Sequence, residues 1–228
     1  MSASAPSGPT LPRDQHLLGD LLHSLSQPLT ILWCSLELSF EDGTEKRQPA
    51  VSAALQQAET VIGLVQLMRE YLDPEPLSRN CTAGLAPALQ SVAEDLSSIA
   101  AVRGIRLRVA GTCAATLPVA QPQLRRALEY LIVPLIARVP TESEIALDLR
   151  EGPGGTELRA QNNHIFSTHE AGPANPRPKR DSAQETISRV RLAIGVRTLE
   201  TAGATLSFED DSPGFVLRIP LRRRHDRR

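Results

Sequence analysis

The chain has 228 residues, of which 41% are hydrophobic, and a formal net charge of −1. This length and composition suffice for one large or two small globular domains and exclude a disordered chain. Aromatic residues make up only 3% of the sequence, so we expect a core built mainly from Leu, Val, Ile and Ala.

The sequence has neither the pattern of a membrane-spanning segment nor the cysteine spacing of a disulfide-bonded protein. No apolar run approaches the roughly 20 residues that span a bilayer, and the N-terminus lacks the basic start and apolar centre of a signal peptide. We therefore expect a cytoplasmic protein without membrane contact. The cysteines, Cys34, Cys81 and Cys113, are odd in number and widely spaced, which predicts reduced thiols rather than a disulfide framework or a metal site. We expect Cys34 to lie in the core.

The first predicted element is a long amphipathic helix. Residues 1–12 are rich in Ser, Ala, Pro and Gly and predict a flexible arm. From Arg13 to about Phe40, leucines recur at steps of three and four residues, which gives one wide apolar face. Pro28 lies inside this pattern, where it leaves the carbonyl of Ser24 without its helical donor and can kink the helix at a cost of about 3 kcal/mol.

A second helix is predicted from Val51 to Leu72, after a connection that we expect to run from Glu41 to Pro49. Residues 13–76 would then form an antiparallel helical hairpin. Both apolar faces are wider than one hairpin can cover, so we predict a homodimeric four-helix bundle. The proline-containing segment from Asp73 to Ala83 predicts a linker to a second domain.

Residues 83–221 alternate between helical and strand patterns and predict an α+β sandwich with a mostly antiparallel sheet. The basic tail at residues 222–228 is predicted to be a solvated terminus rather than a nucleic-acid contact, because the chain as a whole is near neutral. The predicted helices are 85–102, 123–137 and 185–202, and the predicted strands are 105–109, 144–149, 156–160, 205–208 and 215–219.

The segment Leu22-His23-Ser24-Leu25-Ser26-Gln27-Pro28-Leu29-Thr30-Ile31 resembles the phosphoacceptor box of bacterial two-component histidine kinases. The resemblance implies that His23 points outward and accepts a phosphoryl group, which suits the nucleophilic imidazole. It also implies that a response-regulator receiver domain, which brings its own metal and carboxylates, docks nearby. Leu22, Ser26 and Gln27 are then candidate contacts, and Thr30 takes the family's phosphatase position if dephosphorylation occurs.

The sequence departs from this family at the residues that serve ATP. Kinases of this type usually carry an acidic base directly after the histidine, but Ser24 stands here. In the helix that resembles the asparagine box, Tyr130 and Pro134 replace the amide side chains that hold magnesium. Gln161 or Asn162 stands in place of the aspartate that reads adenine, and the glycine-rich phosphate box is replaced by residues 189–194, with Arg189 and Arg191.

The end of the chain keeps the family's structural pattern at residues 199–206 and 214–221, so the resemblance covers roughly residues 15–221. It implies a dimeric helical hairpin followed by a degenerate ATPase-like domain. We therefore predict a histidine phosphotransferase that relays a phosphoryl group between His23 and a receiver aspartate, with no cofactor and no metal. The predicted partners are a receiver domain and a second copy of the chain, with a hybrid kinase as a further candidate and no nucleic acid.

Other interpretations remain open. One is a pseudokinase scaffold that dimerises and binds partners without using His23, and another is an active histidine kinase with an unusual nucleotide site. Arg189 and Arg191 could instead grip a phosphate, although charged residues at the start of a helix usually form a solvated face. His164 and His169, beside Glu170, could ligate a metal but lack a third firm ligand.

Overall fold

The computed structural model describes residues 11–41, 44–74, 76, 81–163, 182–208 and 214–220. The chain divides into two compact units. The first contains helices α1 and α2, and the second contains helices α3 and α4 and both sheets. Helix α5 (Ser182–Thr201) is divided between them after Val190. Among the helices of these ranges, none is both long and apolar enough to cross a bilayer.

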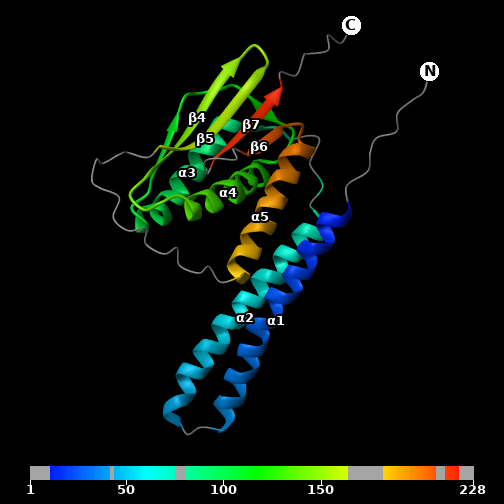
Figure 1. The fold of residues 1–228 in the computed structure, drawn as a ribbon, viewed down its shortest axis with the longest axis vertical. Coiled ribbons are helices and arrows are strands. Elements are labelled where there is room, and N and C mark those ends of the chain that lie inside the picture. The colour runs from blue at the N-terminus through cyan, green and yellow to red at the C-terminus, as the bar shows by residue number, and fades with distance from the viewer. Residues whose placement is uncertain are drawn as a thin grey trace, which may run out of the picture. The chain divides into compact units, whose positions relative to one another are not determined.

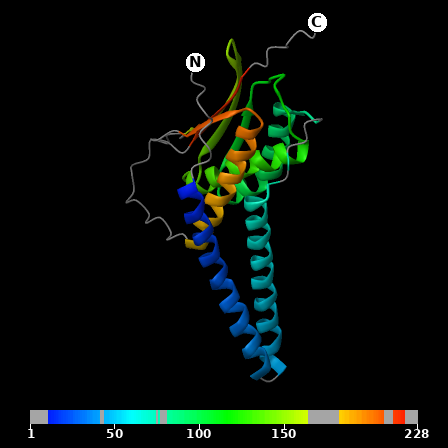
Figure 2. The ribbon, with the colours of Figure 1, turned by 90° about the vertical axis from the view of Figure 1, so that its right-hand side faces the viewer.

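The first unit is built on an antiparallel helical hairpin of α1 (Leu11–Glu41) and α2 (Thr44–Leu72) (Figures 1 and 2). The sequence predicts this hairpin, and the structure confirms it. The side chains buried along it follow the helical period, because residues three, four or seven apart share one face. They are Leu21, Ser24 and Pro28 on α1 and Ala54, Leu64, Leu67 and Tyr71 on α2.

Two expectations about the hairpin are wrong. The connection is shorter than predicted, since α2 begins at Thr44 and Pro49 lies inside it. A proline near a helix start removes only one backbone donor, and the Glu, Lys, Arg and Gln residues before it favour helix. Cys34 is exposed rather than in the core, because it lies on the side of α1 away from Leu21 and Pro28.

The second unit contains a five-stranded sheet in the order β2-β4-β5-β7-β6. The β2–β4 pair is parallel and the other three pairs are antiparallel, which confirms the predicted mostly antiparallel sheet. The bounds are Arg106–Ala110 for β2, Glu144–Gly152 for β4, Gly155–Asn163 for β5, Thr205–Phe208 for β6 and Phe215–Pro220 for β7.

One face of this sheet is covered by α3 (Leu85–Val102) and α4 (Gln121–Arg138) (Figure 1). Alternate residues of the strands point into this layer, as the pleat of a strand requires. The core is mainly Leu, Ile, Val and Ala, with Phe215 as its largest buried side chain. The predicted α+β sandwich is therefore confirmed.

A second sheet of two short strands, β1 (Ala83–Gly84) and β3 (Thr116–Leu117), was not predicted. Strands of two residues show no periodicity, so the sequence carries no signal for them. Leu117 and Ala83 are both buried in the main core. This small sheet joins the start of α3 to the segment before α4.

Candidate functional site

The residues of the histidine motif form one exposed stripe on α1. His23, Ser26, Gln27 and Thr30 are exposed, and Leu22 is 56% exposed. Steps of three and four residues place side chains above one another on a helix. The structure thus brings the five predicted site residues together on a single helical surface, with the imidazole open to solvent.

Ser24 points the other way. Its side chain is only 5% exposed, and its Oγ donates a hydrogen bond to the carbonyl oxygen of Asp20 at 2.8 Å. A hydroxyl that is buried and committed to the backbone cannot remove a proton from the neighbouring imidazole. The residue after His23 therefore does not serve as a general base.

The hydroxyls on the exposed stripe also bond to the backbone of their own helix. The Oγ of Ser26 donates to the carbonyl oxygen of Leu22 at 3.1 Å, and the Oγ1 of Thr30 donates to that of Ser26 at 2.9 Å. Pro28, which is buried, supplies no amide hydrogen to the carbonyl of Ser24. Neither hydroxyl bond goes to the carbonyl of Ser24, so these bonds do not replace the one that Pro28 removes.

In the second unit, neither Tyr130 nor Pro134 on α4 has a side chain that could hold magnesium. Pro134 is buried in the core-facing side of the helix. Tyr130 is half-buried, and its ring lies 6.0 Å from the guanidinium carbon of Arg191 on α5. The contact is within cation–π range.

Two buried polar atoms in this unit have no hydrogen-bond partner within the described residues, the Oδ1 of Asn162 and the Nε of Arg191. Asn162 is near the end of β5, and Arg191 lies on α5. Arg189, two residues earlier, is exposed. Tyr130 and Arg191 belong to separate motifs, and nothing in the sequence links side chains so far apart, so their contact could not be predicted.

Gly195 brings α5 close to α4. A Cβ atom at this position would lie 2.9 Å from the carbonyl oxygen of Ala127 and 3.2 Å from the Cβ of Tyr130. Such a contact is too close for a side chain, so only glycine permits this approach. The glycine thereby helps to set the distance between Arg191 and Tyr130, which flank it on the two helices.

No cluster of three or more His, Cys, Asp or Glu side chains suited to a metal ion occurs among the residues that the structure describes. His164, His169 and Glu170, the weaker metal candidates from the sequence, lie outside these residues. That hypothesis therefore stays a prediction.

No protein-family model and no curated protein sequence matches the chain. Its similarity to solved structures is extensive. The histidine kinase AdeS of Acinetobacter baumannii aligns with a TM-score of 0.62 and 13% identity over 87% of this chain and 97% of AdeS. The chain has a histidine-kinase-like fold. This confirms the predicted pairing of a helical hairpin with an ATPase-like sandwich.

Two other histidine kinases show the same fold. ThkA, solved in complex with the response regulator protein TrrA, aligns with a TM-score of 0.60 and 13% identity over 90% of this chain and 61% of that chain. Full-length ShkA, in complex with AMPPNP, aligns with a TM-score of 0.56 and 16% identity over 91% of this chain and 46% of that chain. At these identities the likeness concerns the fold, so activity has to be argued from this chain's own residues.

Proposed function

We propose that the protein is a two-component signalling protein, a histidine phosphotransferase that relays a phosphoryl group between His23 and a receiver aspartate without binding ATP. The observation that carries this proposal is the exposed His23 within a stripe of exposed side chains on α1. A nucleophile that must meet an aspartyl phosphate on another protein has to be accessible, and a helix surface offers a rigid place to present it.

The chemistry needs little from this chain beyond His23. A ring nitrogen attacks the phosphorus of the receiver's aspartyl phosphate, the P–O bond to the carboxyl group breaks, and the carboxylate leaves with the electron pair. The imidazole loses its ring proton to solvent as the P–N bond forms. Because this exchange requires no deprotonation of His23 by a neighbour, the buried and hydrogen-bonded Ser24 does not hinder it.

The second unit supports a function without ATP. Tyr130 and Arg191 contact each other at positions where the resemblance implies an amide ligand and a phosphate-approaching backbone. A tyrosine cannot hold magnesium against phosphates, and a bulky side chain prevents the close backbone approach that glycine allows. The scaffold is retained while the side chains that would serve a nucleotide are replaced.

The hairpin also supports the proposal of a homodimer. Large apolar side chains on α1 and α2 remain 41% to 65% exposed in the single chain. Apolar surface of this extent usually marks an interface, and a second hairpin packing against it would make a four-helix bundle. Outside the His23 stripe, the exposed residues are Leu29, Ile31, Trp33, Leu36, Val51, Leu55, Ile62, Val65 and Leu72.

A receiver domain is the proposed partner of the His23 stripe. Leu22 offers apolar contact area beside the imidazole, while Ser26 and Gln27 offer hydrogen-bonding groups one turn further along the helix. Such a patch, apolar at one side and polar around it, is typical of a transient protein interface. A receiver carried by a hybrid kinase would present the same chemistry as a free response regulator.

The proposal is tested by incubating the full chain with radiolabelled ATP and, separately, with receiver domains that carry a labelled phosphoryl group. We expect label only from the phosphorylated receivers, with none in His23→Ala. Gln56→Ala, an exposed polar substitution on α2, serves as the control and is expected to accept label like the wild type. Label from ATP alone would indicate an active kinase, and no label from any receiver would favour a scaffold.

A further inference from the structure

The face of the five-stranded sheet opposite the helices carries a row of charged residues across four strands. Arg150 on β4 lies opposite Glu157 on β5. Glu157 in turn lies opposite Arg218 on β7, and Arg218 lies opposite Thr205 on β6. Side chains opposite one another on neighbouring strands share a face. The row is therefore a continuous surface feature rather than four scattered positions.

A hollow of about 510 Å³ lies at this row, where β4 turns into β5. Its lining includes Arg150, Arg218 and Thr205 of the row, together with Gly154 and Pro220. Glycines occupy most of the β4–β5 turn, so no side chains fill this space. The volume is large enough to receive one or two side chains of another molecule.

Both acidic residues of the hollow are already engaged. The Oε2 of Glu157 accepts a hydrogen bond from the Nε of Arg218 at 3.0 Å, and the Oε1 of Glu151 accepts one from the backbone amide of Ala114 at 2.7 Å. Arg150, in contrast, is exposed and makes no ion pair or side-chain hydrogen bond with any described residue. Glu151 alternates with Arg150 along β4, so its carboxylate, which keeps its negative charge, lies on the other face of the strand. On the outward row the charges of Glu157 and Arg218 offset each other, and Arg150 leaves one unpaired positive charge.

The remainder of this face is also basic. Arg106, Arg108 and Arg159 lie on it with Glu144 and Asp148, and Arg108 forms a 3.7 Å ion pair with Glu144. Of the eight charged residues named on this face, five are arginines and three are acidic. The surface is therefore complementary to an anionic partner.

From this arrangement we propose that the hollow binds an acidic peptide segment of a partner protein, with a Glu or Asp side chain placed on Arg150 and Thr205. A guanidinium pairs with a carboxylate through two parallel hydrogen bonds, which gives such a contact both strength and direction. The neighbouring Pro220 and glycine backbone provide apolar contact for the adjacent peptide residue. This site belongs to the second unit and His23 to the first, and binding of the peptide does not depend on phosphotransfer.

A nucleic acid fits these observations less well. Single strands are usually held by aromatic side chains on which bases stack, and none of the residues lining the hollow is aromatic. The net charge of the chain is −1, which disfavours the long-range attraction that nucleic-acid-binding proteins use. A compact hollow beside one free arginine suits a discrete carboxylate better than a polyanionic backbone.

The test uses the full chain and fluorescence anisotropy of a fluorescein-labelled decapeptide of alternating Glu and Ala, with the Gln-Ala peptide as the neutral probe. We expect binding of the acidic peptide only. Arg150→Gln is expected to weaken it about tenfold, the effect of losing a charge-assisted pair. Arg138→Gln removes one exposed charge from the end of α4 and is expected to change binding by less than about twofold.

A second variant blocks the space rather than the charge. A Cβ at Gly154 would meet no atom within 4 Å, so Gly154→Leu should fold normally. Its side chain should fill the hollow, and we expect it to weaken binding of the peptide to the same extent as Arg150→Gln. His23→Ala should bind the peptide like the wild type, which separates this result from the phosphotransfer proposal. The inference is overturned if Arg150→Gln and Arg138→Gln weaken peptide binding equally, or if Gly154→Leu leaves it unchanged. It is also overturned if the peptide does not bind up to about 1 mM protein. Binding of poly-uridine in preference to the peptide, lost in Arg150→Gln, would point to a nucleic acid instead and overturn it as well.

Discussion

The guanidinium carbon of Arg191 lies 6.0 Å from the centre of the Tyr130 ring. These residues come from α5 and α4, and the close approach of the two helices at Gly195 allows them to meet. Their contact occupies positions that the resemblance assigns to nucleotide and magnesium binding. Under the proposed function, this side-chain pair takes the place of a ligand site.

The Arg191–Tyr130 contact is expected to stabilise the second unit without any nucleotide. Arg191→Met keeps most of the side-chain volume and removes the charge, and Tyr130→Leu removes the ring. Each should lower the free energy of unfolding in urea by about 0.5–1.5 kcal/mol, with a coupling of about 0.5–1 kcal/mol between them in a double-mutant cycle. Additive losses, with no coupling, would show that the two side chains do not interact.

Dimerisation is expected to depend on the exposed apolar face of the hairpin. Leu55 and Ile62 on α2 are 62% and 56% exposed, so Leu55→Glu and Ile62→Glu would place charges inside a bundle interface at a cost that should shift the chain to a monomer. Sedimentation velocity measures the change. Val102→Glu, on α3 at 89% exposure, is the matched control. If all three variants sediment like the wild type, the face is not a dimer interface.

Gly111 is expected to be intolerant of any side chain. Its φ is +79°, and a Cβ there would lie 2.1 Å from the carbonyl oxygen of Leu149 on β4. Gly111→Ala should therefore cost about 2–4 kcal/mol of unfolding free energy, through both strain and displacement of the strand. Gly154→Ala, whose Cβ would meet nothing within 4 Å, should change stability by less than about 0.5 kcal/mol. Equal thermal midpoints for the two variants would refute this.

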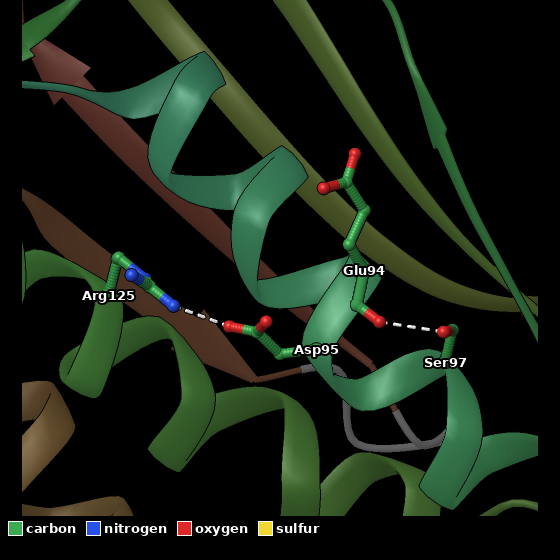
Figure 3. A network of polar contacts seen from close by, with 4 residues as sticks. All are labelled: Glu94, Asp95, Ser97 and Arg125. Carbon is green, nitrogen blue, oxygen red and sulfur yellow. Dashed lines mark hydrogen bonds and ion pairs between the residues drawn. The ribbon is translucent and has the colours of Figure 1, made fainter.

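Figure 3 shows one surface link between α3 and α4, the 2.5 Å ion pair of Asp95 and Arg125, beside the bond from Ser97 to the backbone of Glu94. Both partners of this pair are well exposed, so it contributes little. The stronger link is Arg103, which donates hydrogen bonds to the carbonyl oxygens of Ile136 and Val139 at the end of α4.

Arg103→Met should therefore destabilise the chain by about 1–3 kcal/mol, because it leaves part-buried carbonyls of α4 without donors. Arg125→Met is the matched control and should lose less than about 1 kcal/mol. Urea unfolding followed by circular dichroism measures both. A larger loss in Arg125→Met than in Arg103→Met would reverse this ranking of the two contacts.

Much of the fold could be predicted because it follows from periodicity. The leucine spacing on α1 indicated the long helix, and the outward position of His23 followed from the motif it resembles. Of the leucines in that spacing, Leu21 is buried while Leu22 and Leu29 are exposed. The final hairpin was also predicted, and β6 and β7 pair antiparallel as expected. Local patterns of this kind record which side of an element is buried.

What could not be predicted depends on tertiary contacts. The exposure of Cys34 depends on which side of α1 meets α2, and a wide apolar face does not say which part a single chain covers. β4 begins where predicted but continues to Gly152, and β5 is longer at both ends than predicted. The cross-strand row of Arg150, Glu157 and Arg218 depends on register. Residues so far apart in sequence are brought together only by the sheet.

The central claim is that His23 carries a phosphoryl group obtained from a receiver, and locating that group tests it most directly. After incubation with a phosphorylated receiver and no ATP, tandem mass spectrometry under neutral conditions should place the group on His23, and ³¹P NMR should show an acid-labile phosphoramidate. His23→Ala should show neither signal. An acid-stable phosphoryl group on Ser24 or Ser26 would contradict the account. So would a chain that stays unmodified after incubation with receivers that do transfer their phosphoryl group to other histidine proteins.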